Sequence, residues 1–242
     1  MLSDLPRYLR SRGLARTLRE FPGYLRHRWL RRQYYTGYYQ AESEDGFDAR
    51  FGTDTTGIVE AFSFGRPEGH GAHRYEAVSV ETLEEALAQV GSDAEGAVFV
   101  DIGAGKGRAV LLASHLPFRS LVALDLSADM LRVAADNFEK YRPREKSCHE
   151  LATVCMDALD YELPDDRLVV YLFNPFPAEV MAEFVERVEA SLEKSPREIV
   201  VLYVNPICDA FRNSEEFVLQ AEGTAGRQHW QCFRSRRCAP SD

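Results

Sequence analysis

The sequence predicts an α/β fold: a doubly wound, mostly parallel sheet of seven strands with an antiparallel hairpin strand at its C-terminal end, preceded by an N-terminal helical extension. Two observations carry this prediction. From about residue 97, short β-rich runs alternate strictly with helical patterns, which is typical of parallel strands joined by right-handed crossovers. After Pro206 the alternation stops, and two β-rich runs flank a glycine-containing turn.

The expected strands are recognised by their length and residue type. Short runs rich in valine, isoleucine and leucine, bounded by turn residues, are consistent with strands buried in a parallel sheet. We expect parallel strands at residues 97–102, 121–125, 151–155, 168–173 and 198–204, and hairpin strands at 216–220 and 228–233 around a turn at 223–226.

Capping residues and apolar spacing predict the helices. Ser79 and Ser127 are favourable N-caps, because a serine oxygen can accept a hydrogen bond from a free backbone N–H of the first turn. After Pro177, apolar residues recur at every fourth position and form one buried face. We expect helices over residues 80–90, from the glycine-rich loop to about 115, from 128 to about 141, and from Pro177 onward, with a short helix after Pro206.

Composition and cysteine usage narrow the class of protein. The 242 residues are 45% hydrophobic and 28% charged, as in soluble globular proteins. The longest apolar runs, 168–173 and 199–204, are far shorter than the roughly 20 residues that a bilayer-spanning helix needs. The five cysteines include no C-x-x-C pair, so no disulfide framework is indicated. We therefore expect a cytoplasmic protein without a transmembrane segment.

Charge divides the chain into a basic N-terminal segment and an acidic body. Residues 1–32 contain nine arginines and two acids, a net charge of +7, which leaves −16 for the rest of a chain whose total is −9. Apolar residues recur there at helical intervals, so we expect amphipathic helices packed on the acidic body. Arginine-rich segments also suit nucleic acid, anionic membrane surfaces or targeting peptides, and these alternatives stay open.

A glycine-rich segment after the first parallel strand is the most informative part of the sequence. A strand runs directly into Gly103-x-Gly105-x-Gly107 and then into a helical pattern, so the backbone there can approach a ligand closely. A P-loop is excluded, because Gly107 stands where serine or threonine should follow Gly105-Lys106. A dinucleotide motif does not fit, because Arg108 occupies the place of its third glycine.

Polar residues lie at the carboxyl ends of four consecutive strands. Asp101 precedes the glycine loop, Asp125 ends the second strand, and Asp157 and Asn174 follow the third and fourth. Doubly wound sheets bind ligands at this edge. A carboxylate at Asp125 can accept both hydroxyls of a ribose, and one at Asp157 can accept an adenine amino proton. Each residue alone could be a cap or a turn former, but together they predict one ligand site.

The motif Asp101-x-Gly-x-Gly-x-Gly107, followed by Asp125, resembles that of class I (seven-strand, Rossmann-like) S-adenosylmethionine-dependent methyltransferases, over about residues 75–233. The resemblance implies S-adenosylmethionine as the cofactor, a ligand with a ribose and an amino-acid moiety but no pyrophosphate. The residues implied to bind it are Asp101, Gly103, Gly105, Lys106 and Gly107 at the methionine end, Asp125 and Leu126 at the ribose, and Asp157 and Ala158 at the adenine.

The turn after the fourth strand indicates the acceptor. Asn174-Pro175-Phe176 resembles the Asn-Pro-Pro-Tyr/Phe loop of amino-group methyltransferases but is one residue shorter, and seven-strand histone-lysine enzymes also have an asparagine after this strand. The Asn174 oxygen can accept an amine N–H, and Phe176 can face the developing cation. These three residues are the candidate catalytic residues, and they favour a nitrogen acceptor on a protein or a small molecule.

Two cations beside the glycine loop have two interpretations each. Lys106 lies at a helix N-terminus, where the macrodipole disfavours a cation by about 0.3–1 kcal/mol. The methionine carboxylate would explain its presence, and a lysine directed into solvent is the alternative. The same two interpretations hold for Arg108.

A polar loop further upstream is a second candidate element of the site. Residues 51–57, Phe-Gly-Thr-Asp-Thr-Thr-Gly, predict either a helix cap followed by a loop, or a lid with Asp54 and Thr55 directed toward the cofactor. Tyr75 and Glu76 fall where enzymes of the resembled family line the methionine end.

The sequence as a whole therefore predicts an S-adenosylmethionine-dependent methyltransferase with two domains. Residues 1–74 form the basic helical extension with its lid loop, and residues 75–242 form the methyltransferase domain. No metal is expected, because His229, Cys232 and Cys238 are irregularly spaced. Two alternatives stay open: a cofactor-binding module without catalysis, and a nucleic-acid methyltransferase recruited by the arginine-rich arm.

Overall fold

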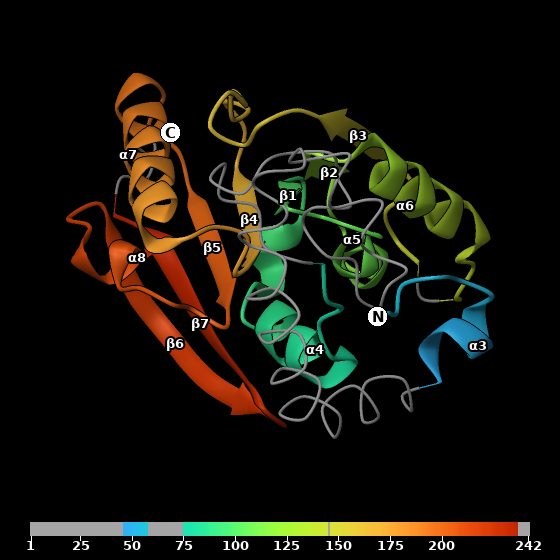
Figure 1. Ribbon diagram of the computed structural model, residues 1–242. Helices are drawn as coiled ribbons and strands as arrows, with labels where there is room; N and C mark the ends of the chain where they lie inside the picture. Colours follow the sequence, from blue (N-terminus) through green and yellow to red (C-terminus); the bar gives the residue numbers. More distant parts are fainter. Residues whose placement is uncertain (1–45, 58–74, 145, 237–242) are drawn as a thin grey trace, which may run out of the picture.

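The computed structural model describes residues 46–57, 75–144 and 146–236 (Figure 1). The helices predicted within residues 1–32 lie outside these ranges, as does Cys238. In the described part of the chain, no helix is long and apolar enough to cross a membrane.

The described residues form one seven-stranded sheet in the order β3-β2-β1-β4-β5-β7-β6. The first five strands pair in parallel, and β7 runs antiparallel to both β5 and β6. The predicted sheet with its C-terminal hairpin is therefore confirmed. The strands are β1 (Val98–Ile102), β2 (Ser120–Asp125), β3 (Leu151–Cys155), β4 (Leu168–Phe173), β5 (Ile199–Val204), β6 (Phe217–Ala225) and β7 (Gln228–Ser235).

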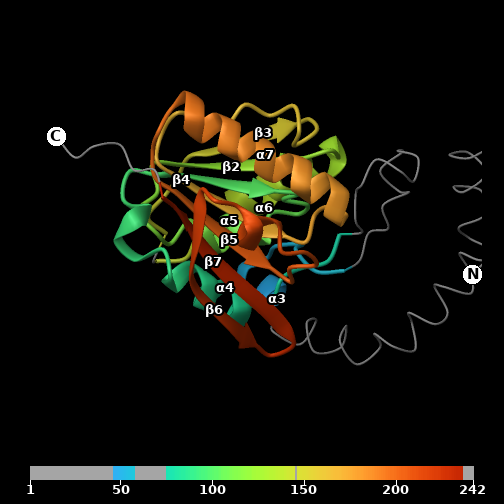
Figure 2. The ribbon, with the colours of Figure 1, turned by 90° about the vertical axis from the view of Figure 1, so that its left-hand side faces the viewer.

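Helices cover both faces of the sheet and bury two separate apolar clusters (Figure 2). Alternate residues of each strand supply the two clusters: Phe99 belongs to one, and Val98 and Val100 belong to the other. One face packs against α4 (Val80–Ala88), α5 (Arg108–Ala113) and α6 (Ala128–Lys140), and the other packs against α7 (Ala178–Lys194) and α8 (Ala210–Asn213).

The predicted serine caps are confirmed. The Ser79 side chain accepts a hydrogen bond from Thr82 N, and the Ser127 side chain accepts one from Met130 N. Helix α4 ends at Ala88, two residues before the predicted end, and a short 3-10 helix (Gly91–Ala94) follows it.

The predicted hairpin turn at residues 223–226 is wrong. Strand β6 continues to Ala225, so the chain turns at Gly226 and Arg227. Gly223 lies inside the strand, where an added Cβ would be 2.5 Å from the Trp230 ring. Glycine is required there for packing, because it lets the indole lie directly against the backbone.

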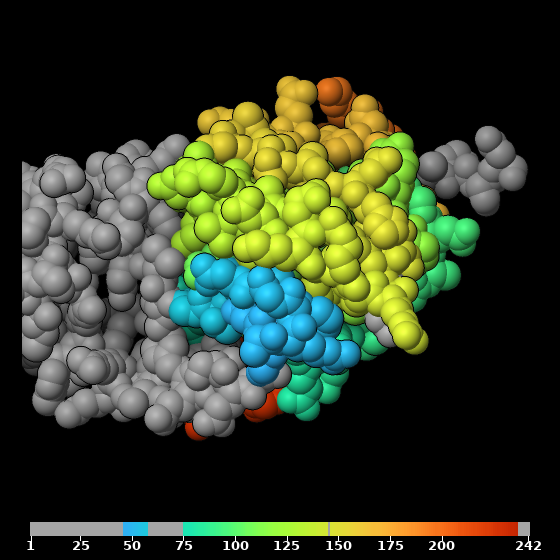
Figure 3. All heavy atoms as spheres, turned by 90° about the vertical axis from the view of Figure 1, so that its right-hand side faces the viewer, coloured from blue at the N-terminus to red at the C-terminus, as the bar shows by residue number. Residues whose placement is uncertain are grey.

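A short upstream segment packs beside α6 (Figure 3), with a ring contact at the C-terminal end of that helix. We call residues 46–57 the strap; it contains α3 (Phe47–Phe51), which Gly52 ends with a φ of 68°. The rings of Phe47 and Phe51 pack on Tyr141, with centroid distances of 5.6 and 4.6 Å. Of the two alternatives for this segment, the helix cap followed by a loop is present, and the lid over the cofactor stays a prediction.

Gly107 provides a test of how closely α5 packs against α6. Its φ is 84°, and an added Cβ would lie 2.8 Å from the Ala134 Cβ. We expect Gly107→Ala to lower the free energy of unfolding by about 2–4 kcal/mol, because backbone strain and a steric clash add. Gly226, with a φ of 57° and nothing within 4 Å of an added Cβ, is the control, and Gly226→Ala should cost about 1–2 kcal/mol. Urea unfolding measures both, and equal losses would contradict the packing argument.

Candidate functional site

The candidate site lies where the parallel strands end. The registers pair Ile102 with both Leu124 and Leu172, and Asp125 with Cys155. The loops that follow β1, β2, β3 and β4 therefore all leave the same edge of the sheet. The direction of winding reverses between β1 and β4, which is the usual ligand position in such sheets.

Asp125 holds the glycine loop in place. Its Oδ2 accepts a hydrogen bond of 2.9 Å from Gly105 N, and its Oδ1 accepts one of 2.8 Å from Ser127 N. The backbone N–H groups of Gly103 and Ala104 both donate to Leu124 O at 2.9 Å. Each carboxylate oxygen has two lone pairs, so Asp125 can still accept hydrogen bonds from a ligand.

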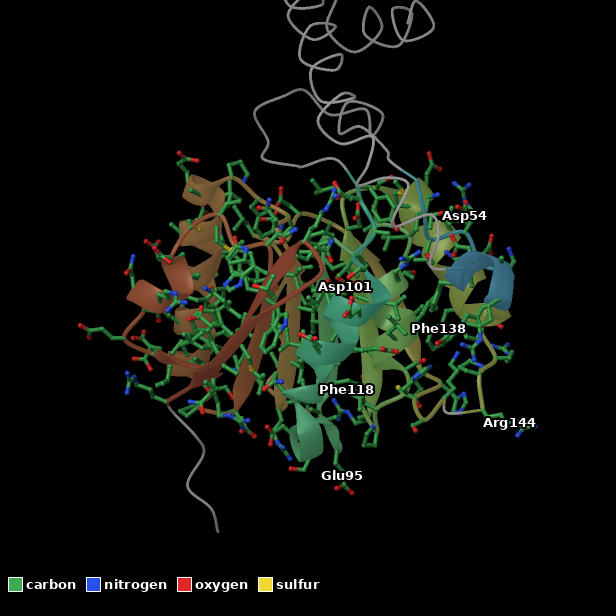
Figure 4. All side chains as sticks on the ribbon, turned by 90° about the horizontal axis from the view of Figure 1, so that it is seen from below. Asp54, Glu95, Asp101, Phe118, Phe138 and Arg144 are labelled. Atoms are coloured by element: carbon green, nitrogen blue, oxygen red, sulfur yellow. The ribbon has the colours of Figure 1, made fainter. Side chains whose placement is uncertain are left out.

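Two neighbouring carboxyl groups at this edge have different environments. Asp101 lies in the interior of the domain (Figure 4) and is 2% exposed. Its burial, together with the negative charge of Asp125, raises its pKa well above the usual value. Burial also raises the pKa of Asp125, but hydrogen bonds from Ser127, Gly105 and Leu126 oppose that rise. The hydrogen bonds at Asp125 favour its charged form, so Asp125 is a better acceptor for hydroxyl groups than the more deeply buried Asp101.

The Asn174 turn lies against the glycine loop. A Cβ added at Gly103 would be 3.0 Å from the Pro175 Cβ, so the loops after β1 and β4 are in contact. Asn174 has a φ of 42°, and its Oδ1 is buried with no hydrogen-bond partner among the described residues. The Phe176 ring packs on Phe184 of α7 at 5.6 Å, which fixes its position relative to that helix.

The residues after β3 and β2 occupy the adjoining part of the edge. Asp157 Oδ1 accepts a hydrogen bond of 3.0 Å from Leu159 N and so organises the turn after β3. The Leu126 carbonyl accepts a hydrogen bond of 3.7 Å from Cys155 Sγ, and Ala158 is buried in the core on the α7 side. The adenine contacts of Asp157 and Ala158 and the ribose contact of Leu126 stay predictions.

The two cationic side chains beside the glycine loop, Lys106 and Arg108, both form hydrogen bonds with the strap. Lys106 Nζ donates to Asp54 Oδ1 at 2.6 Å and to Thr56 O at 2.8 Å, and its side chain is only 13% exposed. Arg108 is 2% exposed, and its Nε donates to Thr55 Oγ1 at 2.9 Å. The alternative in which these cations point into solvent is therefore wrong. It failed because a buried arginine is rare and nothing local in the sequence indicates one.

Three further polar residues contribute to this region although the sequence patterns did not predict them. Asn205 repeats the Asn-Pro pattern of Asn174 after the neighbouring strand, has a φ of 49°, and accepts a hydrogen bond of 3.1 Å from His229 N. Asn137 is fully buried on α6, and Asp48 accepts several hydrogen bonds within the strap. The repeated Asn-Pro pair was a visible signal, as was an asparagine on the apolar face of α6.

Comparison with known proteins finds a matching family for part of the chain and solved structures of similar fold. Residues 99–195 match the family described as "Methyltransferase domain". No curated protein matches the chain.

Three solved structures are similar in fold, at low sequence identity. A candidate RNA methyltransferase from Pyrococcus horikoshii is 15% identical with a TM-score of 0.52, over 73% of this chain and 92% of that one. A conserved hypothetical protein from Streptococcus pyogenes is 14% identical with a TM-score of 0.50, over 63% and 94%. An RNA methyltransferase from Salinibacter ruber, in complex with S-adenosylhomocysteine, is 15% identical with a TM-score of 0.48, over 69% and 97%.

The segment that matches the family contains the glycine loop, Asp125, Asp157 and Asn174. It also spans the four parallel strands whose ends form the candidate site. The family match over residues 99–195, together with the seven-stranded fold, supports a class I, Rossmann-like, S-adenosylmethionine-dependent methyltransferase domain in this part of the chain.

Proposed function

We propose that this protein transfers the methyl group of S-adenosylmethionine to a nitrogen atom of a substrate, which is another protein or a small molecule. The observation that carries this proposal is the Asn174 side chain, whose buried Oδ1 accepts no hydrogen bond from the described residues. Buried polar atoms are nearly always satisfied by protein groups or ordered water, so an unsatisfied oxygen beside a ligand site is available to a donor of the ligand. An amine N–H is such a donor.

The residues at the carboxyl edge of the parallel strands fit S-adenosylmethionine as the cofactor. Asp125 already binds the glycine loop through Gly105 and keeps acceptor capacity for ribose hydroxyls. The glycine loop bonds to Leu124 O through two of its N–H groups, so its shape is set before any ligand binds. S-adenosylmethionine supplies an activated methyl group on a sulfonium sulfur. In this proposal Asp125 holds the ribose, and Asp157 accepts from the adenine amino group.

Asn174 would orient the acceptor. A carboxamide is not a base, so it cannot remove a proton from an ammonium group; the acceptor must present a free lone pair. The Asn174 oxygen can accept the amine N–H and so direct that lone pair along the line of displacement, where alignment supplies much of the rate. The contact between Pro175 and Gly103 keeps the Asn174 turn beside the glycine loop.

A nucleic-acid acceptor is the second candidate. The observation that favours it is the net charge of +7 on residues 1–32, which suits a polyanion. The remaining residues carry −16 and would repel phosphate, so recruitment would depend on the arm.

Replacement of Asp125 tests the cofactor assignment. We expect Asp125→Ala to weaken S-adenosylhomocysteine binding at least tenfold, because charge-assisted hydrogen bonds contribute about 1.5–3 kcal/mol each. Isothermal titration calorimetry measures the affinity, and Asp136→Ala, an exposed acid on α6, is the control. An unchanged affinity in Asp125→Ala would refute the ribose assignment.

Replacement of Asn174 separates acceptor from cofactor. We expect Asn174→Ala to lower methyl transfer at least a hundredfold, while S-adenosylhomocysteine affinity changes less than threefold, because the side chain faces the acceptor. Asn205→Ala is the matched control, because it alters the other Asn-Pro turn with positive φ and should retain most activity. A parallel loss of affinity would move Asn174 to the cofactor site.

The acceptor class follows from labelled-methyl transfer into fractionated extract. We expect label in the protein or small-molecule fraction, and the same amount after deletion of residues 1–32. Label in nucleic acid that disappears with this deletion and falls steeply with salt would establish the second candidate instead.

A further inference from the structure

The strap is organised around a single carboxylate. Asp48 accepts hydrogen bonds from the hydroxyls of Thr53, Thr55 and Thr56, at 2.7–2.9 Å, and from the backbone N–H groups of Thr55 and Thr56, at 2.8–2.9 Å. Burial alone would raise the pKa of Asp48, but these hydrogen bonds outweigh it and lower the pKa to about 2. The ionised carboxylate therefore sets the conformation of residues 53–56.

Buried polar groups attach this segment to the methyltransferase domain. The Thr55 hydroxyl donates to Asp48 and accepts from Arg108, so it links a buried cation to a carboxylate. Asn137 of α6 binds both the N–H and the carbonyl of Asp54, at 2.8 and 2.9 Å. Its amide also donates to the Lys106 carbonyl at 2.9 Å, so one side chain joins the strap to the glycine loop.

The strap also reaches the face of the glycine loop through Tyr75. The Tyr75 hydroxyl donates to the Thr55 carbonyl. Its ring lies on Gly105, where an added Cβ would be 2.1 Å from a ring carbon. Gly105 thus has Asp125 bonded to its N–H and Tyr75 packed on its Cα. Burial raises the pKa of Tyr75, which keeps the phenol protonated as a donor.

From these contacts we infer that Asp48 is a positioning residue for the cofactor. Asp48 acts through Thr55, whose carbonyl binds Tyr75 and so holds the Tyr75 ring against Gly105. It also maintains the contacts of the strap with Lys106. Together these contacts maintain the cofactor-binding conformation of the glycine loop. The inference rests on the proposed function, because it takes this loop as the cofactor site. It assigns to the strap a role that the family match, confined to residues 99–195, does not include.

Calorimetry on the full chain with S-adenosylhomocysteine tests this role. Asp48→Asn places an amide donor among the threonine donors, so we expect affinity to fall at least fivefold. Tyr75→Phe keeps the ring but removes the hydrogen bond to Thr55, so we expect a smaller loss, about twofold to fivefold. Asp136→Asn, the same change on the exposed surface of α6, should leave affinity unchanged.

Two further measurements separate positioning from general destabilisation. In hydrogen exchange, the Thr55 and Thr56 amides should be protected in the wild type, protected further by S-adenosylhomocysteine, and rapidly exchanged in Asp48→Asn. In the transfer assay, Asp48→Asn should raise KM for S-adenosylmethionine while kcat changes less than threefold.

The outcomes distinguish this inference from the proposed function. The positioning role would be overturned, and the proposed function left intact, by either of two results. One is wild-type affinity in Asp48→Asn, and the other is an exchange rate of the strap amides that does not change when S-adenosylhomocysteine binds. If Asp48→Asn does not fold, wild-type affinity in Tyr75→Phe would overturn it. Failure of the wild type itself to bind S-adenosylhomocysteine would overturn the proposed function, and this inference with it.

Discussion

The parallel pairing of β1 with β2 and β4 is the constraint on which the candidate site depends. It places the glycine loop beside the end of β2, where Gly105 N can donate to Asp125, and beside the Asn174 turn, where Gly103 meets Pro175. A slip of one residue in either pairing would reverse the faces of the strand side chains. The two apolar clusters prevent such a slip, because each face of β1 has its own buried set.

The two faces of the sheet support different halves of the site. On one face, α5 and α6 carry Arg108 and Asn137, which bind the strap and through it the glycine loop. On the other face, α7 holds Phe176 through Phe184, and so supports the turn that carries Asn174. The glycine loop and the Asn174 turn are therefore supported by separate helical layers that meet at the edge of the sheet.

Buried polar groups specify the position of the strap more than apolar packing does. Phe47 and Phe51 supply aromatic contacts to Tyr141, but such contacts tolerate small displacements. The chain of hydrogen bonds from Arg108 through Thr55 to Asp48 does not, because each buried polar atom costs free energy when its partner is lost.

The sequence by itself determined the sheet, the caps at Ser79 and Ser127, and the polar residues at the strand ends, because each has a local signature of period or spacing. It misplaced the hairpin turn, because Gly223 serves the distant Trp230 ring. Only the tertiary structure decided that Arg108 is buried, that Lys106 binds Asp54, and that Tyr75 lies on Gly105. These contacts join segments about 30 to 50 residues apart, and such pairings leave no periodic pattern in the chain.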